Sequence, residues 1–227
     1  MSEPAPATPP TEATPWTEAI RSGRCPLCFL LRQDEFDELR RWVGGDVADD
    51  QNRRRLDEAR GFCNGHFWLL AELHSPQSGS LVNDYVATSL IEWLRHPARQ
   101  DWPAQAAWLR EAASRCPLCA RLRACETAHL RALVGWLSDR AAWSHYAESR
   151  GLCLPHFLRC QALVQDLSLR EQLCQAQAVQ IERLQREMRQ LARKLAAGQR
   201  WEVSRNEWVA WERATEKFVG RRGLAPP

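Results

Sequence analysis

Apolar residues recur every three or four positions along most of the chain, which is the spacing of one face of an α-helix. The clearest runs lie within residues 27–43, 67–73, 81–94 and 169–197. Between them, residues 74–80 (HSPQSGS) are rich in Pro, Ser and Gly and predict a loop. No segment shows the sustained polar–apolar alternation that predicts a strand. The pattern therefore predicts an all-α fold, a helical bundle.

The last long helix is predicted over residues 169–197, where apolar positions step by three and four through Ile181, Leu184, Met188, Leu191 and Leu195. This run covers about two heptads, fewer than a coiled coil requires. We therefore expect the helix to pack on its own bundle rather than on a partner helix. A final amphipathic stretch follows Gly198 and carries several large aromatic residues.

The chain also repeats itself. Residues 24–45 align with residues 115–136 at an offset of 91, and residues 58–67 align with residues 148–157 at an offset of 90. Identical residues fall at twelve of 22 positions in the first block and six of ten in the second, far above chance. The two offsets differ by one residue, which indicates a single deletion between the two blocks. We therefore predict an internally duplicated bundle, and internal repeats of this kind define the unit of folding.

Each copy contains C-P-L-C followed by G-x-C-x-x-H. The gap is 34 residues between Cys28 and Cys63, and 33 residues between Cys119 and Cys153. Two ligands three residues apart can hold one ion, and three thiolates with one imidazole complete the tetrahedral shell that zinc prefers. The predicted metal ligands are Cys25, Cys28, Cys63 and His66 in the first copy, and Cys116, Cys119, Cys153 and His156 in the second. We expect one Cys3His site in each copy.

Arginines near the predicted ligands, and cysteines outside the repeated pattern, bear on the prediction of a metal. Arginines stand just before the ligand pairs in both copies, at Arg24, Arg60, Arg115 and Arg150. They are either solvated surface residues or hydrogen-bond donors to the thiolates. The remaining cysteines, Cys125, Cys160 and Cys174, have no counterpart in the first copy, so we expect ordinary buried residues there.

Composition limits the class of protein. Residues 1–18 begin with a proline-rich stretch that lacks the basic start and apolar run of a secretory signal, and we expect them to be disordered. No stretch approaches the roughly 18 consecutive apolar residues of a membrane span. We therefore expect a cytoplasmic protein without membrane contact. In a reducing compartment, nine cysteines indicate metal or redox chemistry rather than disulfides.

Two function classes remain open. Zinc, two ions per chain, predicts closed structural sites in a scaffold or protein-interaction module, and no common catalytic motif is present, so we expect no enzyme. The alternative is an iron–sulfur cluster or reactive thiols in a redox, electron-transfer or sensor protein. A nucleic-acid partner has weaker support, because residues 170–200 carry seven basic and three acidic side chains, which also suits a solvated helix face.

The paired C-P-x-C and G-x-C-x-x-H blocks, with the tail WERATEKFVGRRG at residues 211–223, resemble an uncharacterised bacterial family known as a domain of unknown function. The resemblance implies a shared fold and the same eight ligand positions, and it implies no activity. Together with the repeat it predicts four segments: residues 1–18, disordered; 19–101, the first metal-binding repeat; 106–197, the second; and 198–227, a C-terminal helix and tail.

Overall fold

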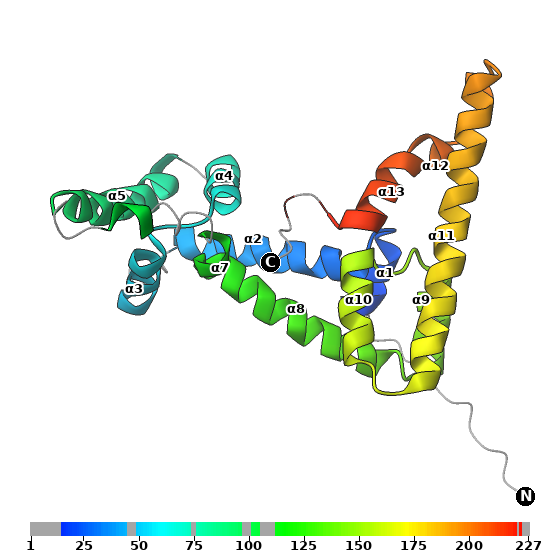
Figure 1. The fold of residues 1–227 in the computed structure, drawn as a ribbon, viewed down its shortest axis with the longest axis horizontal. Helices are drawn as coiled ribbons and strands as arrows, with labels where there is room; N and C mark the ends of the chain where they lie inside the picture. Colours follow the sequence, from blue (N-terminus) through cyan, green and yellow to red (C-terminus); the bar gives the residue numbers. More distant parts are fainter. Residues whose placement is uncertain are drawn as a thin grey trace, which may run out of the picture.

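The computed structural model describes residues 15–44, 49–73, 76–96, 101–104, 112–221 and 223. Within these ranges the structure is helical and has no strand, so the predicted all-α class is confirmed (Figure 1). No helix in these ranges is long and apolar enough to cross a membrane. The helices are α1 (Pro15–Arg21), α2 (Pro26–Gly44), α3 (Asp50–Ala59), α4 (Asn64–Leu73), α5 (Pro76–Leu94), α7 (Ala112–Arg115), α8 (Pro117–Trp136), α9 (Arg140–Glu148), α10 (Leu154–Leu163), α11 (Leu167–Ala196), α12 (Arg205–Trp208) and α13 (Ala210–Val219), with a short 3-10 turn, η3 (Arg200–Glu202).

The helices α2 and α8 form the centre of the molecule and run antiparallel (Figure 1). Two side-chain contacts give the direction: His129 lies 2.7 Å from Asp34, and Arg121 lies 3.8 Å from Glu38. The helices α3, α4 and α5 gather at the carboxyl end of α2, and α1 with α9–α13 gather at its amino end. Each end of the central pair therefore carries one half of the fold.

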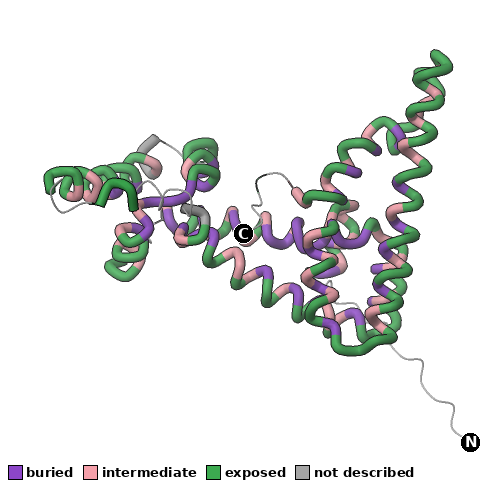
Figure 2. The backbone as a smooth tube through the Cα atoms, viewed as in Figure 1, coloured by how far each residue is buried: buried purple, intermediate pink, exposed green. Residues whose placement is uncertain are grey.

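Two separate hydrophobic cores form at these two ends, and buried segments concentrate there in Figure 2. The offsets of 91 and 90 relate residues of one core to residues of the other. Corresponding buried pairs are Leu27 and Leu118, Leu39 and Leu130, Trp42 and Leu133, Leu56 and Tyr146, Phe62 and Leu152, and Leu70 and Cys160. Equivalent positions thus contribute to both cores. The duplication itself stays a prediction, as do the segment boundaries.

Two local predictions were wrong. Residues 15–18 are helical instead of disordered, because Trp16 is buried and stacks on Trp136 with ring centroids 6.3 Å apart. The rest of the predicted disordered segment lies outside the described residues. Residues 76–80 begin α5 instead of forming a loop, since proline at the first helical position already has the backbone angle of a helix.

The helix α11 matches the predicted long helix, and it packs on its own chain as expected. Its inward face buries Leu173, Gln177, Gln180 and Leu184. The chain then turns back, so that α12 and α13 lie against α11, and α13 also contacts α10. The C-terminal segment therefore adds a wall to the half of the fold that contains α9 and α10.

A glycine turn precedes each C-x-x-H pair. Gly61 has φ +99° and Gly151 has φ +61°, a region that side chains with a β-carbon rarely adopt. Space is also restricted, because a β-carbon on Gly61 would lie 2.7 Å from the Phe67 ring, and one on Gly151 would collide with the Gln180 amide. Both the turn and the packing require glycine at these positions.

We predict that Gly151→Ala destabilises the protein by about 2 kcal/mol or more, because it adds both strain and a collision. Thermal or urea unfolding measures the change. Gly135→Ala is the matched control: Gly135 lies within α8 with open space around it. That exchange should stabilise the protein by about 0.5 to 1 kcal/mol. Equal stability of the Gly151→Ala chain and the wild type would contradict the argument.

Candidate metal centres

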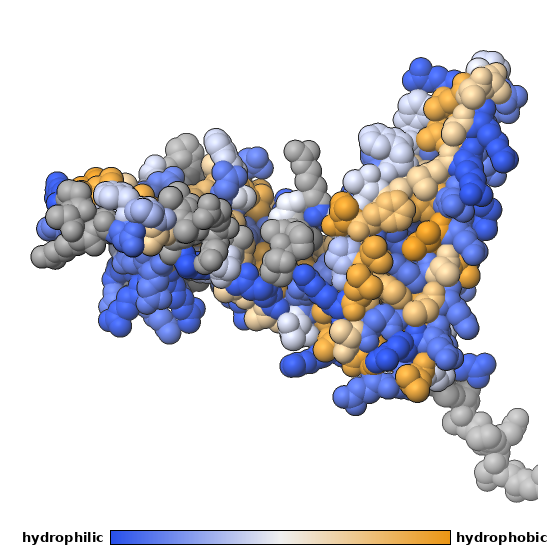
Figure 3. All heavy atoms as spheres, in the orientation of Figure 1, coloured by the Kyte–Doolittle hydropathy of each residue, from blue (hydrophilic) through white to orange (hydrophobic). Residues whose placement is uncertain are grey.

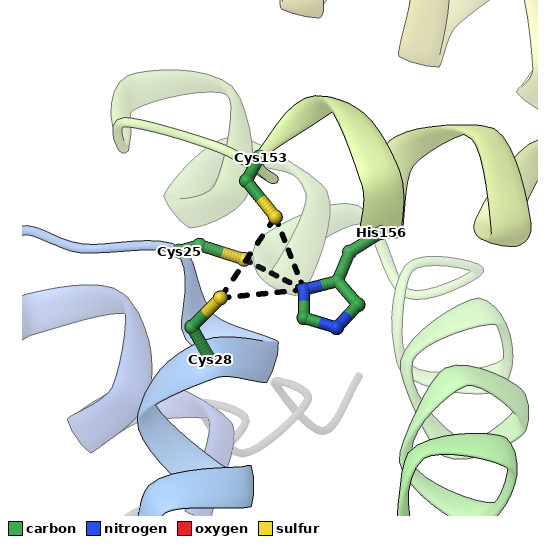
Figure 4. A group of neighbouring side chains, drawn as sticks. All are labelled: Cys25, Cys28, Cys153 and His156. Atoms are coloured by element: carbon green, nitrogen blue, oxygen red, sulfur yellow. Dashed lines mark hydrogen bonds between the residues drawn. The ribbon is translucent and has the colours of Figure 1, made fainter. Parts of the chain in front are cut away.

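The eight predicted ligands come together in two clusters, each of three cysteines and one histidine. Site 1 contains Cys25, Cys28, Cys153 and His156, and site 2 contains Cys63, His66, Cys116 and Cys119. The expected assignment of one site to each copy was therefore wrong. Each site takes C-P-L-C from one copy and C-x-x-H from the other (Figure 4 shows site 1).

The antiparallel central pair explains this crossing. A helix of 19 residues such as α2 is about 28 Å long, so Cys28 at its amino end lies far from α4 at its other end. The carboxyl end of α8 reaches the same place as the amino end of α2, and from there the chain continues into α9 and α10. The C-x-x-H pair nearest to Cys28 is therefore that of the second copy.

All four ligand pairs lie in the first turn of a helix. Cys25, Cys63, Cys116 and Cys153 each stand directly before a helix, with a carbonyl that accepts the first helical hydrogen bond. The second ligand of each pair follows three residues later, on the same face. The amino end of a helix carries partial positive charge, which stabilises thiolates. A ligand pair in the first turn of a helix thus occurs four times.

The ligand atoms have the spacing of one shared ion. The Nδ1 atoms of the two histidines lie between 3.1 and 3.4 Å from the Sγ atoms of their sites. Sulfur atoms are 3.8 Å apart for Cys28 and Cys153, and 3.7 Å apart for Cys63 and Cys119. A tetrahedral zinc ion has ligands about 3.8 Å (S to S) and about 3.6 Å (S to N) apart. Both clusters fit a single ion.

A buried glutamate holds each histidine from behind. The Nε2 atom of His66 lies 3.1 Å from Glu35, and that of His156 lies 3.1 Å from Glu126. Each carboxylate also accepts a hydrogen bond from an arginine, Arg32 or Arg159. Such a carboxylate orients the imidazole so that its other nitrogen faces the metal.

Sequence reasoning missed this pair of glutamates. The signal was present, because Glu35 and Glu126 are identical residues at the 91 offset. Glutamate in a helix is usually solvent-exposed, whereas Glu35 is only 1% exposed and Glu126 only 8%. The recurrence of a glutamate at matching positions of the repeated ligand pattern was the feature that could have identified this pair.

Hydrogen bonds among the ligand atoms shift their pKa values. Burial lowers the pKa of His156, but hydrogen bonds with Cys153, Cys25 and Glu126 outweigh burial and raise this pKa to about 12. The pKa of His66 rises in the same way to about 11. Hydrogen bonds lower the pKa of Cys63 and raise that of Cys119. An ion must displace these protons, so metal affinity falls as the pH falls.

The two sites differ in what covers them. All four ligands of site 2 are buried, whereas Cys25 of site 1 is half-buried. Beside site 1, α13 places the buried Lys217 close to Cys25 and Cys153, and burial lowers the pKa of Lys217 to about 8 although both cysteines raise it. A cation beside three thiolates offsets the negative charge that they bring.

The repeated arginines have other contacts. Arg24 pairs with Glu216 at 3.0 Å, and the guanidinium of Arg60 lies 4.5 Å from the Trp93 ring centroid. Their support of the thiolates stays a hypothesis. Among the other cysteines, Cys160 is buried in the core and burial raises its pKa to about 11. Cys174 is exposed, so the expectation of burial was wrong there.

The fold and the two sites define an all-α protein with two candidate Cys3His metal centres. The chain belongs to the Family of unknown function (DUF6062), whose family model matches residues 12–222. The resemblance seen in the sequence is thereby confirmed, and it carries no activity with it. No curated protein and no solved structure matches the chain.

Metal content of double variants tests the crossed pairing. Cys28→Ser with Cys153→Ser removes two ligands of one site, so about one ion per chain should remain. Cys28→Ser with Cys63→Ser removes one ligand from each site, and the chain should lose both ions to a weak chelator. Elemental analysis after dialysis measures the content. The opposite result for the two variants would show that each copy forms its own site.

The buried glutamates allow a second prediction. Glu126→Gln keeps the shape and removes the charge behind His156, so metal affinity at site 1 should fall about 10- to 100-fold. Competition with a chromophoric chelator measures the affinity of each site. Glu182→Gln on the exposed face of α11 is the control and should change nothing. Unchanged affinity at site 1 in the Glu126→Gln chain would refute the role of this carboxylate.

Proposed function

We propose that this protein binds two structural zinc ions and works as a helical scaffold or protein-interaction module. The observation that carries the proposal is the closed ligand set: at each site three sulfur atoms and one Nδ1 atom converge on one point, with a carboxylate behind the imidazole. A shell filled by four protein ligands leaves no open position for a substrate, which is typical of structural zinc.

The distance in sequence between the segments that each ion would connect supports a structural role. Site 1 links residues 125 positions apart, and site 2 links residues 56 positions apart. The helices α4 and α10 have ten residues each, too few to be stable alone in water. An ion at the amino end of each helix would fasten it to the central pair and stabilise the closed loop.

An apolar surface supports the interaction role. Large apolar side chains stay exposed on α10 and α13, which contact each other, and Figure 3 shows apolar atoms gathered over these helices. The exposed residues are Leu154, Leu158, Leu163, Trp211, Phe218 and Val219. Tryptophan and phenylalanine on an exposed patch are typical of protein interfaces. We therefore favour a protein partner.

The competing proposals have less support. An iron–sulfur cluster distributes its cysteines over several irons and separates their sulfur atoms more than a single ion does, whereas the ligand atoms here all lie within 4.8 Å of one another. A thiol-based redox role has one supporting observation, the half-buried Cys25. Of the basic residues proposed for nucleic acid, Arg170 and Lys194 already bond within the chain.

The decisive measurement is elemental analysis with a visible spectrum on protein purified without oxygen. We expect about two zinc ions per chain and no colour. A strong chelator should then lower the melting temperature by about 10 °C or more, because structural zinc contributes folding free energy. Iron with acid-labile sulfide and a brown colour would contradict the zinc proposal, and zinc removal without a change in melting temperature would contradict the structural role.

A further inference from the structure

A pocket of about 270 Å³ opens beside site 1, and Cys25, Cys28 and Cys153 form part of its wall. The turn before α2 and the turn between α9 and α10 supply two other sides. The C-terminal helices α11, α12 and α13 close it. The pocket is thus completed by the C-terminal segment.

The wall of the pocket has an excess of positive charge. Six basic side chains line it, against the three acidic residues Glu148, Glu187 and Glu216. Two of these acids are already paired, Glu216 with Arg24 and Glu187 with Arg213. The basic residues outside these pairs are Arg150, Arg183, Lys217 and Arg221. The three cysteines in the wall matter too, because three thiolates around a divalent ion add a net charge of about −1. Positive charge still exceeds what the chain itself neutralises there.

Lys217 is held by the protein and so has a structural part. Its ammonium group donates to the Arg150 carbonyl at 2.8 Å, to Gln177 at 3.1 Å and to Gln180 at 3.3 Å. These three bonds use all its donors. Lys217 thus ties α13 to α11 and to the turn before Cys153, which leaves the guanidinium groups as the donors that can face a ligand.

The guanidinium groups of Arg150 and Arg221 lie near other arginine side chains. The Arg150 guanidinium lies over Gly23, 3.7 Å from where a β-carbon would stand, directly beside the turn that leads to Cys25. Burial and the nearby Arg213 lower the pKa of Arg150, and burial with Arg24 lowers that of Arg221. Like charges held together in a partly buried hollow favour an anion between them.

The hollow that the described residues form near site 2 differs from this pocket. The hollow near site 2 is lined by residues that include Arg55, Glu58 and Arg115, and no cysteine lines it. The positions that match Arg24 and Glu148 of the first pocket are Arg115 and Glu58. Here three basic residues face two acidic ones, so little charge excess remains. The excess is specific to the side that α11 and α13 enclose.

We propose that the pocket beside site 1 binds a small phosphorylated molecule, with its phosphate group on Arg150, Arg183 and Arg221. Guanidinium groups match the paired oxygens of a phosphate, and a doubly charged group suits the charge excess of the wall. The volume is near the lower end for ligand pockets, so it accommodates a small metabolite. This proposal requires that site 1 holds a metal ion, and it does not depend on which metal that is.

Isothermal titration of the metal-loaded full chain tests the proposal, with inorganic phosphate, pyrophosphate and citrate as probes. Pyrophosphate should bind with a Kd of about 1 mM or tighter, and more tightly than citrate. Arg150→Ala with Arg183→Ala should weaken binding about tenfold or more, and Arg221→Ala should do so independently. Metal content is measured for each chain, so that loss of site 1 is distinguished from loss of the anion site.

The matched control is Arg55→Ala with Arg121→Ala, which removes the same charge beside site 2. This chain should keep wild-type affinity for pyrophosphate. Equal weakening in the control would show that only overall charge attracts the anion, and this would overturn the proposal. Absence of heat with both phosphate probes would overturn it too. Tighter binding of citrate than of pyrophosphate would replace phosphate by a carboxylate ligand.

Discussion

Three cysteines and one histidine meet at each end of the α2–α8 pair, and as three thiolates such a group in a protein interior would need a cation at its centre. The surrounding structure suits this requirement. Four helix amino ends point at the two clusters, and buried glutamates orient the histidines. The hydrophobic cores then assemble beside the clusters, so that Cys63, Cys116 and Cys119 are themselves part of one core.

Both halves contain this arrangement of ligands, helix ends and glutamates, and they differ in the segments that surround it. Around site 2 the ligands are buried by the short helices of the first half. Around site 1 the C-terminal segment provides α11 and α13, and with them Lys217 and Gly220, where a β-carbon would lie 3.8 Å from the Cys153 sulfur. The tail motif WERATEKFVGRRG therefore has a physical meaning: its lysine and its first glycine fit against site 1, and its buried Ala214 packs on α11.

The sequence alone was sufficient for the helical class, the long helix at residues 169–197 and the eight residues that gather in the two Cys3His clusters. Periodicity reports which face of a helix is buried, and ligand spacing reports which residues share a helical turn. Neither reports which turns meet in space. The gaps of 34 and 33 residues are compatible with a site inside each copy and with crossed sites, and only the antiparallel order of α2 and α8 separates the two. Glu35 and Glu126 were missed for a related reason, since their burial depends on helices distant in sequence.

Because each site takes ligands from both copies, the two halves depend on each other to form the sites. Within one copy, C-P-L-C and C-x-x-H lie at opposite ends of a helix about 28 Å long, so one copy cannot complete a site by itself. A single copy of this module could bind ions in this geometry only by pairing with a second copy, in the manner of a symmetric dimer. The presence of both sets of motifs in one chain makes that pairing intramolecular, so that assembly of both clusters does not depend on protein concentration. The two halves still differ, because the pocket beside site 1 has an excess of basic residues and the hollow beside site 2 has little.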